Sequence, residues 1–206
     1  MKIADGIYAI DGTNAHVYVI DTGSGVLQVD SAMRGQFGRI RSFYSSVGLR
    51  PNAVAVTHSH MDHVGELASV VKAYGSKAYA HPEEIPVIEG RRPAYTRSAL
   101  VRILGSIVRP RPVAGVLDIH SLALPGIGVL ETPGHTPGSV TLVYERGGER
   151  YLFVGDAAFE RGGRLEVNSR YSLDVEMAAR SLEVIRSMSP ALVLPGHGRP
   201  VRIQRT

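Results

Sequence analysis

Three of the eight histidines in the sequence fall within the six residues His58-Ser59-His60-Met61-Asp62-His63. This cluster directly follows Ala53-Val54-Ala55-Val56, a short apolar run that is typical of a buried strand. On extended backbone, side chains two residues apart point the same way, so the rings of His58 and His60 would lie together. A catalytic transition-metal ion usually takes three protein ligands plus water. The four potential ligands at this strand end, three histidines and Asp62, therefore indicate two ions, provided that other segments supply further ligands.

Three later segments each place one more potential ligand at the end of an apolar run. His135 lies in Glu131-Thr132-Pro133-Gly134-His135-Thr136-Pro137-Gly138-Ser139. Asp156 ends Tyr151-Leu152-Phe153-Val154-Gly155-Asp156, and His197 follows Leu192-Val193-Leu194-Pro195-Gly196. The neighbouring glycines permit tight turns and close approach of the backbone. The candidate metal ligands are thus His58, His60, Asp62, His63, His135, Asp156 and His197.

Apolar and amphipathic runs predict the elements that must position these groups. A loop is expected over 57–63, and helices are expected over 34–48, 64–74 and 174–188, the last beginning near Asp174. Neither a repeat nor a linker is evident, so residues 1–206 are expected to form one domain of mixed α/β class. Strands are expected over 6–10, 15–20, 26–30, 53–56, 77–80, 121–131, 138–145, 150–155 and 191–194.

The composition excludes several classes of protein and of site. No stretch of the 206 residues reaches the roughly 18 apolar residues of a membrane span. The N-terminus has no apolar signal core, so we expect a cytoplasmic protein. The absence of cysteine excludes disulfides, thiolate metal sites and a cysteine nucleophile. A metal site must therefore use histidine and carboxylate, which suit zinc, iron and manganese.

Residues 82–112 form an arginine-rich segment, which we interpret as a helical insertion interrupted by prolines and as a lid or pocket wall to which Tyr95 could contribute. Its arginines could hold a carboxylate or phosphate of a substrate, or they could form a solvated helical face. The net charge of +4 likewise fits an anionic substrate or an ordinary basic surface. The arginines are Arg91, Arg92, Arg97, Arg102, Arg109 and Arg111.

The four motifs together resemble those of the metallo-β-lactamase-fold hydrolases. The run Thr57-His58-Ser59-His60-Met61-Asp62-His63-Val64-Gly65 is similar to the signature of that family. The segments around His135, Asp156 and His197 match its later motifs in order, and Asp30 matches a buried aspartate that ends an early strand. The resemblance extends from about Gly6 to Pro200, which is nearly the whole chain.

This resemblance implies a four-layer αββα sandwich with the site at one edge, between two sheets. By matching position, one metal would be held by His58, His60 and His135, and a second by Asp62, His63 and His197, with Asp156 bridging the two. Asp30 would steady a ligand or its loop, and a purely structural cap is the alternative.

Four other residues near these motifs are assigned no metal. His16, His81 and His120 match no motif, so we do not expect them to be ligands. Glu66 follows the histidine cluster and is expected to cap or solvate the first turn of the next helix.

The implied cofactors are two divalent ions, for which zinc is the first expectation and iron or manganese are alternatives. Such ions lower the pKa of bound water toward about 7, so that a bridging hydroxide could attack a carbonyl group. Asp62 would orient the nucleophile or pass a proton to the leaving group. We therefore expect a hydrolase that cleaves an ester-like bond, of the thioester or lactone class, in a small-molecule substrate.

The resemblance restricts the range of expected substrates only partly. The first motif and Thr132–Ser139 resemble the thioesterase branch known as glyoxalase II, which has a further C-terminal helical region that binds glutathione. The present chain ends nine residues after His197, so glutathione-thioester hydrolysis is not the specific expectation. Lactonases of this fold place a tyrosine shortly after the bridging aspartate, where this chain has Phe159.

Three alternative functions remain. A mononuclear-iron sulfur dioxygenase would need fewer ligands than the seven present. A phosphodiesterase or nuclease would fit the basic charge, but aromatic–basic interleaving is not apparent and nucleic acid is not an expected partner. A non-catalytic metal-binding module would be expected to have lost a ligand, and none of the seven is missing.

Overall fold

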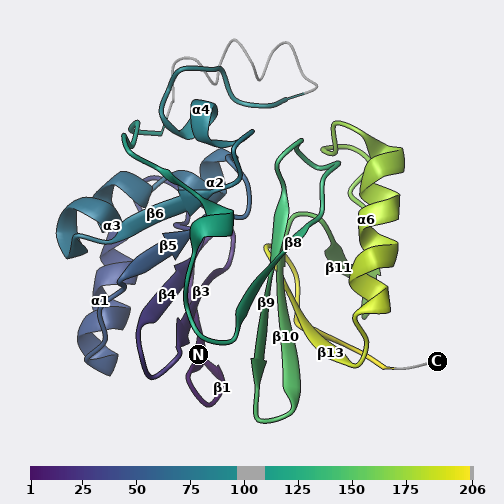
Figure 1. Ribbon diagram of the computed structural model, residues 1–206, viewed down its shortest axis with the longest axis horizontal. Coiled ribbons are helices and arrows are strands. Elements are labelled where there is room, and N and C mark those ends of the chain that lie inside the picture. The colour runs from purple at the N-terminus through teal and green to yellow at the C-terminus, as the bar shows by residue number, and fades with distance from the viewer. Residues whose placement is uncertain (97–109, 205–206) are drawn as a thin grey trace.

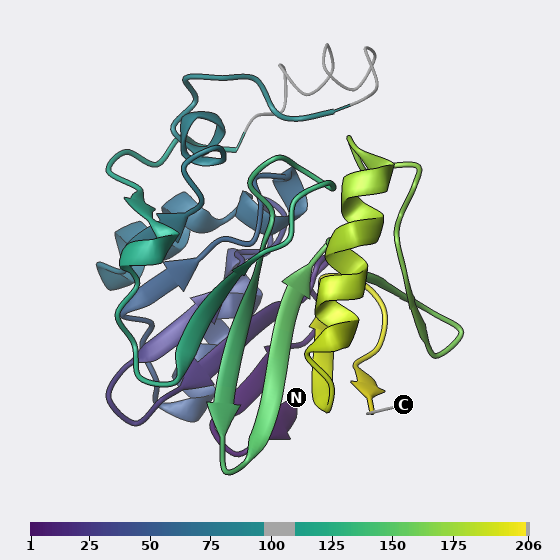
Figure 2. The same ribbon diagram turned by 45° about the vertical axis from the view of Figure 1, so that its right-hand side comes forward.

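Two β-sheets lie face to face, and helices cover the outer face of each (Figure 1, Figure 2). This computed structural model describes residues 1–96 and 110–204 of the chain. The first sheet has the strand order β1-β2-β3-β4-β5-β6-β7. Its strands are β1 (Lys2–Ala4), β2 (Ile7–Ile10), β3 (Val17–Asp21), β4 (Val26–Val29), β5 (Ala53–Ala55), β6 (Lys77–Ala80) and β7 (Leu117–Asp118).

The second sheet has the order β14-β13-β10-β9-β8, and a separate hairpin is formed by β11 and β12. The strands are β8 (Ile127–Glu131), β9 (Val140–Arg146), β10 (Glu149–Gly155), β11 (Phe159–Arg161), β12 (Arg164–Glu166), β13 (Ala191–Pro195) and β14 (Val201–Ile203). The described helices are α1 (Phe37–Val47), α2 (Met61–Val64), α3 (Leu67–Tyr74), α4 (Ile85–Ile88), the 3₁₀ turn η1 (Ile119–Ser121) and α6 (Val175–Ser187).

The central strands are apolar on both faces because each face is covered. In β3, Val19 packs into the core beneath α1 and α3, whereas Ile20 packs into the core between the sheets. In β10, Phe153 faces the other sheet and Leu152 faces α6. Alternate side chains therefore enter different cores, as the period of two in a strand requires. Three apolar layers result, which define the αββα sandwich that the sequence predicts.

The ends of several strands meet at one edge of this sandwich. Strand β10 runs parallel to β13 and antiparallel to β9, which is itself antiparallel to β8. Strands β8, β10 and β13 thus end at the same edge. The backbone N–H of Val140 donates to the carbonyl of Thr57 at 3.0 Å, which joins this edge to the end of β5 in the first sheet. The loops that carry the candidate ligands are therefore brought together by sheet pairing.

The predicted loop at 57–63 and helix at 64–74 divide differently in the structure. The short helix α2 already begins at Met61, and α3 begins at Leu67. The backbone of Ser31 explains the break, because its N–H donates to the carbonyl of His63 and its carbonyl accepts from the N–H of Glu66. These bonds occupy backbone groups that a continuous helix would pair internally.

Other differences concern short elements. The strand expected over 121–131 is confined to β8, since Pro125 and Gly126 form a turn directly before it, with Gly126 at φ 76°. The strands β1, β7, β11, β12 and β14 are not predicted by the apolar pattern. They are two or three residues long and offer too few side chains for a periodic signal.

The arginine-rich segment is helical over only a small part of its described length. Within 82–96 and 110–112, α4 is the helix present, and residues 97–109 of the expected helical insertion lie outside the described residues. In the described parts of the chain, no helix combines the length and the apolar character needed to cross a bilayer.

Helix α6 begins where the sequence places it, at Asp174. The Asp174 side chain accepts a hydrogen bond from the N–H of Met177 at 2.8 Å, and its own N–H donates to the carbonyl of Gly134. The helix start is therefore tied to the loop that carries His135. We expect Asp174→Ala to lower the free energy of unfolding by about 1 kcal/mol, because a helix N–H loses its acceptor. Urea denaturation followed by circular dichroism would measure this loss.

The matched control is Glu183→Ala on the exposed face of the same helix. Glu183 forms an ion pair with Arg186 three residues on, a contact worth a few tenths of a kcal/mol. Equal losses in the two variants would contradict the capping role of Asp174.

Candidate metal centre

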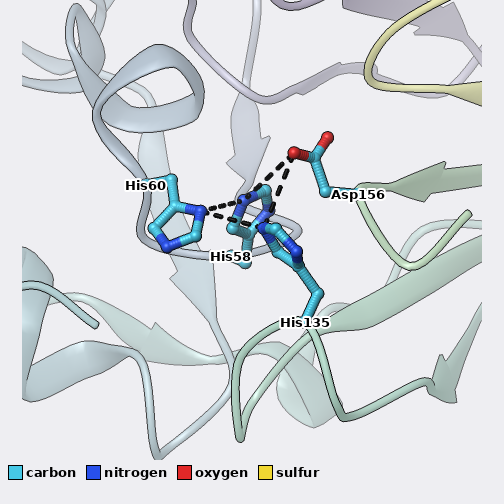
Figure 3. A group of neighbouring side chains, drawn as sticks. All are labelled: His58, His60, His135 and Asp156. Carbon is cyan, nitrogen blue, oxygen red and sulfur yellow. Dashed lines mark hydrogen bonds and ion pairs between the residues drawn. The ribbon is translucent and has the colours of Figure 1, made fainter. Parts of the chain in front are cut away.

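Three imidazole rings and one carboxylate converge in the first group of candidate ligands (Figure 3). His60 Nδ1 lies 3.1 Å from His58 Nε2 and 2.9 Å from His135 Nε2. Asp156 Oδ2 lies 3.5 Å from His135 Nε2. Ligand nitrogens at 2.0–2.1 Å from a tetrahedral ion would lie about 3.3 Å apart, so these spacings fit one ion. The group combines residues from the end of β5, the β8–β9 loop and the end of β10.

A second group lies beside the first and contains Asp62, His63 and His197. Asp62 Oδ2 is 3.1 Å from His197 Nε2 and 3.9 Å from His63 Nε2. Two members come from α2 and the third from the loop after β13. The imidazole and carboxylate atoms again face one another across a space that suits a single ion.

Asp156 lies between the two groups and presents one oxygen to each. Its Oδ2 faces His135, whereas its Oδ1 lies 3.2 Å from His63 Nε2 and 3.7 Å from His197 Nε2. Among the described residues, neither His63 Nε2 nor Asp156 Oδ1 has a hydrogen-bond partner, although both are buried. Buried polar atoms without partners are costly, and a shared cation would satisfy both of these.

Hydrogen bonds on the far sides of the rings fix which nitrogen faces the centre. His60 Nε2 donates to the backbone carbonyl of Tyr95 at 3.0 Å, so Nδ1 is left as the free lone pair. Thr57 donates its hydroxyl to Asp30 at 2.8 Å and can accept from His58 Nδ1 at 3.2 Å, which leaves His58 Nε2 free. Such outer contacts hold metal ligands in one orientation.

Asp30 supports both groups and is buried. Its Oδ2 accepts from His63 Nδ1 at 2.7 Å, and its Oδ1 accepts from the backbone N–H of Thr57 at 2.8 Å. The backbone at Asp30 is left-handed, with φ 61°, a conformation that aspartate tolerates better than most residues. Asp30 thus contacts both a candidate ligand, His63, and the loop that begins at Thr57.

The histidines of the first group are poised to be neutral. Burial lowers the pKa of His58 well below its usual value, and the neighbouring rings of His63 and His135 lower it further. Burial also lowers the pKa of His60, and it lowers that of His135 to about 3. Neutral imidazole is the form that binds a metal, so these three rings need not release protons near neutral pH.

The second group has the opposite protonation. Burial disfavours a charge on His63, but the carboxylates of Asp156 and Asp30 outweigh it and raise its pKa well above the usual value. The hydrogen bond to Asp62 raises the pKa of His197. Burial would raise the pKa of Asp62, yet its hydrogen bond from His197 and the nearby His63 hold that pKa below the usual range. In this group the surroundings thus favour the ionised form of Asp62 and the protonated forms of His63 and His197.

Residues 10–197 match the profile of a protein family described as the metallo-beta-lactamase superfamily. The chain belongs to this superfamily. The resemblance seen in the four motifs is thereby confirmed, and so is the αββα fold that it implies.

Similar proteins include a probable metallo-hydrolase, a hydroxyacylglutathione hydrolase and a protein whose structure was solved in a di-iron-bound form. The probable metallo-hydrolase YflN of Bacillus subtilis is 27% identical, over 97% of this chain and 86% of its own length. A hydroxyacylglutathione hydrolase of Anaeromyxobacter dehalogenans is 29% identical over 90% of this chain, which covers 62% of that protein. The crystal structure of TTHA1623 in a di-iron-bound form is 27% identical, has a TM-score of 0.75 and matches 96% of this chain and 94% of its own.

All seven ligands predicted from the superfamily motifs lie in these two groups, so the cluster is suited to divalent metal ions. The other histidines do not join it. His16 Nε2 donates to the carbonyl of Gly198 at 2.8 Å, while His81 and His120 lie near the exposed Glu131. Their separation from the centre agrees with their lack of a motif.

The expectation for Glu66 needs correction. Glu66 is buried rather than solvated, and its carboxylate accepts hydrogen bonds from the N–H of Gly35 and the hydroxyl of Ser69. It joins the start of α3 to the loop after Asp30 and accepts no bond from a helix N–H. The exposed Arg91 pairs with Glu89, which agrees with a solvated face over this described part of the segment.

Two contributors to the site escape sequence analysis. The carbonyl of Tyr95 holds His60, but a backbone acceptor has no residue signature. Phe159 lies against His197 with ring centroids 5.6 Å apart and planes only 7° from parallel. Its position shortly after Asp156 is a sequence signal, although that signal alone indicates a missing hydroxyl and not a stacked ring.

The contrast in protonation predicts different pH dependence at the two groups. Because the pKa values of His63 and His197 are raised, an ion at the second group must displace protons, and its affinity should fall as the pH is lowered from about 8 to 6. An ion at the first group should bind with little change over that range. Isothermal titration of the apo-protein with zinc, in buffers of different ionisation enthalpy, would count the released protons. Equal proton release for both ions would contradict this assignment.

Removal of the Asp30 charge should weaken both ions. Thr57 donates two hydrogen bonds to Asp30 and His63 donates one, and in Asp30→Asn at least one of these donors loses its acceptor. We expect zinc affinity to fall by about 10–100-fold at each position. Competition with a chromophoric chelator measures this, and Asp21→Asn, at the end of β3, serves as the control. Unchanged affinity in Asp30→Asn would show that the carboxylate supports only the loop.

Proposed function

We propose that this protein is a dinuclear metal-dependent hydrolase that cleaves an ester-like bond, of the thioester or lactone class, in a small-molecule substrate. The observation that carries the proposal is the placement of Asp156, with one oxygen toward each of two groups of potential ligands. A single ion would use only one of these groups. Two ions held close together are a common arrangement for hydrolysis of polarised bonds.

The donor set fits two divalent ions, with zinc preferred and iron or manganese as alternatives. His58, His60 and His135 would hold one ion, Asp62, His63 and His197 the other, and Asp156 would bind both. When bound, such ions supply an activated water and polarise the carbonyl that it attacks. The di-iron form of TTHA1623 supports a two-ion site and keeps iron among the candidates.

Asp62 is the carboxylate in the best position to handle protons. Its side chain is 26% exposed, whereas that of Asp156 is 8% exposed and lies between the two groups. Held ionised by its contact with His197, Asp62 can accept a hydrogen bond from the attacking water and align it. The same carboxylate can then carry a proton toward the leaving group.

One relative supports the thioester part of this class, and the composition of the chain limits the mechanism. The sequence contains no cysteine, so the attack does not proceed through a cysteine acyl-enzyme. The name of the Anaeromyxobacter relative denotes hydrolysis of a hydroxyacylglutathione, which is a thioester. A substrate with an anionic group would also complement the net charge of +4.

The first test counts metal ions and removes the charge of Asp62. Wild-type protein should contain about two ions per chain by elemental analysis, and it should hydrolyse members of a panel of thioesters and lactones. In Asp62→Asn we expect kcat to fall by about 10²–10⁴-fold, because the aligning carboxylate is lost. Phosphodiesters and β-lactams in the same panel would reveal other specificities of the superfamily.

The control for this test is Asp118→Asn, which alters an exposed carboxylate near the same sheet edge. One iron per chain together with oxygen consumption would instead indicate a dioxygenase and would overturn the proposal. Near wild-type turnover by Asp62→Asn would disprove the proton-handling role of Asp62 but not the proposed hydrolysis.

A further inference from the structure

Glu84 is a fully buried carboxylate that no candidate ligand contacts directly. It occupies the position before α4, at the end of the first sheet nearest the metal centre. In the described part of the chain, no lysine or arginine forms an ion pair with it. A buried carboxylate without a cationic partner is costly unless hydrogen bonds compensate it, so its contacts identify its role.

Both oxygens of Glu84 accept hydrogen bonds from loops of the centre. Oε2 accepts from the backbone N–H of Ser59 at 2.9 Å and also from the Ser59 hydroxyl. Oε1 accepts from the backbone N–H of Gly138 at 3.0 Å. Ser59 lies between His58 and His60, and Gly138 lies three residues after His135. One carboxylate therefore joins the two chain segments that carry the three imidazoles of the first group.

We propose that Glu84 is a positioning residue for the first metal position, because it sets the separation between the His58–His60 segment and the His135 loop. The inference rests on the proposed metal centre, although it does not depend on which bond is hydrolysed. The second group receives no comparable contact from Glu84, since His63 is held by Asp30.

The close approach of Gly138 supports this role. A Cβ atom on Gly138 would lie 2.6 Å from His81 Nδ1, 2.9 Å from Glu84 Cγ and 3.0 Å from Glu84 Oε1. Glycine at this position therefore lets the loop backbone reach the carboxylate. The absence of a side chain at Gly138 thus permits its contact with a residue more than fifty positions earlier in the chain.

A carboxylate is required here because all the backbone groups that face it are donors. A glutamine at position 84 has one acceptor oxygen and one amide that only donates. If its oxygen faced Ser59, the amide would oppose the N–H of Gly138, and in the reverse orientation it would oppose the N–H of Ser59. Glu84→Gln must therefore leave one backbone N–H without an acceptor, while keeping the shape of the side chain.

The test measures zinc affinity in two backgrounds, each of which removes a histidine ligand from one group and leaves the other group complete. With His197→Ala present, the first group remains, and we expect Glu84→Gln to weaken zinc binding about 10–100-fold. With His135→Ala present, the second group remains, and Glu84→Gln should change its affinity less than about threefold. Competition with a chromophoric chelator gives both values without any assay of turnover.

The matched control is Glu83→Gln, which alters the exposed neighbouring carboxylate and should leave both affinities unchanged. If Glu84→Gln does not fold, Ser59→Ala removes only the hydroxyl donor and should weaken the first position in the same direction by a smaller factor. The hydrogen bond from Val140 to Thr57 still joins the two loops in each variant. Melting of the apo-proteins checks that they are folded.

Equal weakening at both groups, or none at the first, would overturn the positioning role of Glu84. A wild-type chain that binds no ion would instead disprove the metal centre itself. The two failures are therefore distinguishable in the same titration.

Discussion

The placement of Asp156 between two sets of imidazoles is the constraint on which the site depends. Its carboxylate is nearly buried, and its two oxygens face ligands that come from both sheets. Such a position exists only if the end of β10 meets the end of β5 and the loops beside it. Gly196 makes this possible, because a Cβ atom there would lie 2.5 Å from Asp156 Oδ1. The sandwich edge is therefore packed around the charges that it holds.

Three buried carboxylates hold the ligands and loops of the centre in place. Asp156 faces both groups, Asp30 holds His63 and Thr57, and Glu84 holds the backbone of Ser59 and Gly138. Burial penalises each of these charges, so each persists only where donors or cations compensate it. Asp30 and Glu84 are satisfied by N–H and O–H groups of the chain, whereas Asp156 Oδ1 accepts no hydrogen bond from the described residues. That difference separates the supporting carboxylates from the one suited to an ion.

The two groups favour different protonation states of their histidines, although Asp156 lies between them and faces both. In the first group burial dominates and lowers the pKa values of the three imidazoles, while in the second the carboxylates dominate and raise the pKa values of His63 and His197. The first is thus ready for an ion without proton release, and the second exchanges protons for its ion. Asp62, the most exposed carboxylate of the centre, lies in the second group, where proton exchange with a substrate would take place.

The sequence by itself determined the family, the αββα class and the seven residues of the centre. This was possible because the ligands lie in local motifs, and because apolar runs before His58, Asp156 and His197 mark strands that deliver them. It also located the start of α6 at Asp174, since a capping residue acts on its own helix. Each of these features depends on residues close together in the chain.

Only the tertiary structure decided how those residues are supported. The break between α2 and α3 depends on Ser31, which lies far from the helical pattern that predicted one helix. Glu84 carries no signal in a single sequence, because its partners Ser59 and Gly138 offer backbone N–H groups that every residue type shares. Likewise, the carbonyl of Tyr95 acts on His60 through a backbone atom. Contacts between distant segments through the backbone leave no pattern of residue types, so only folding reveals them.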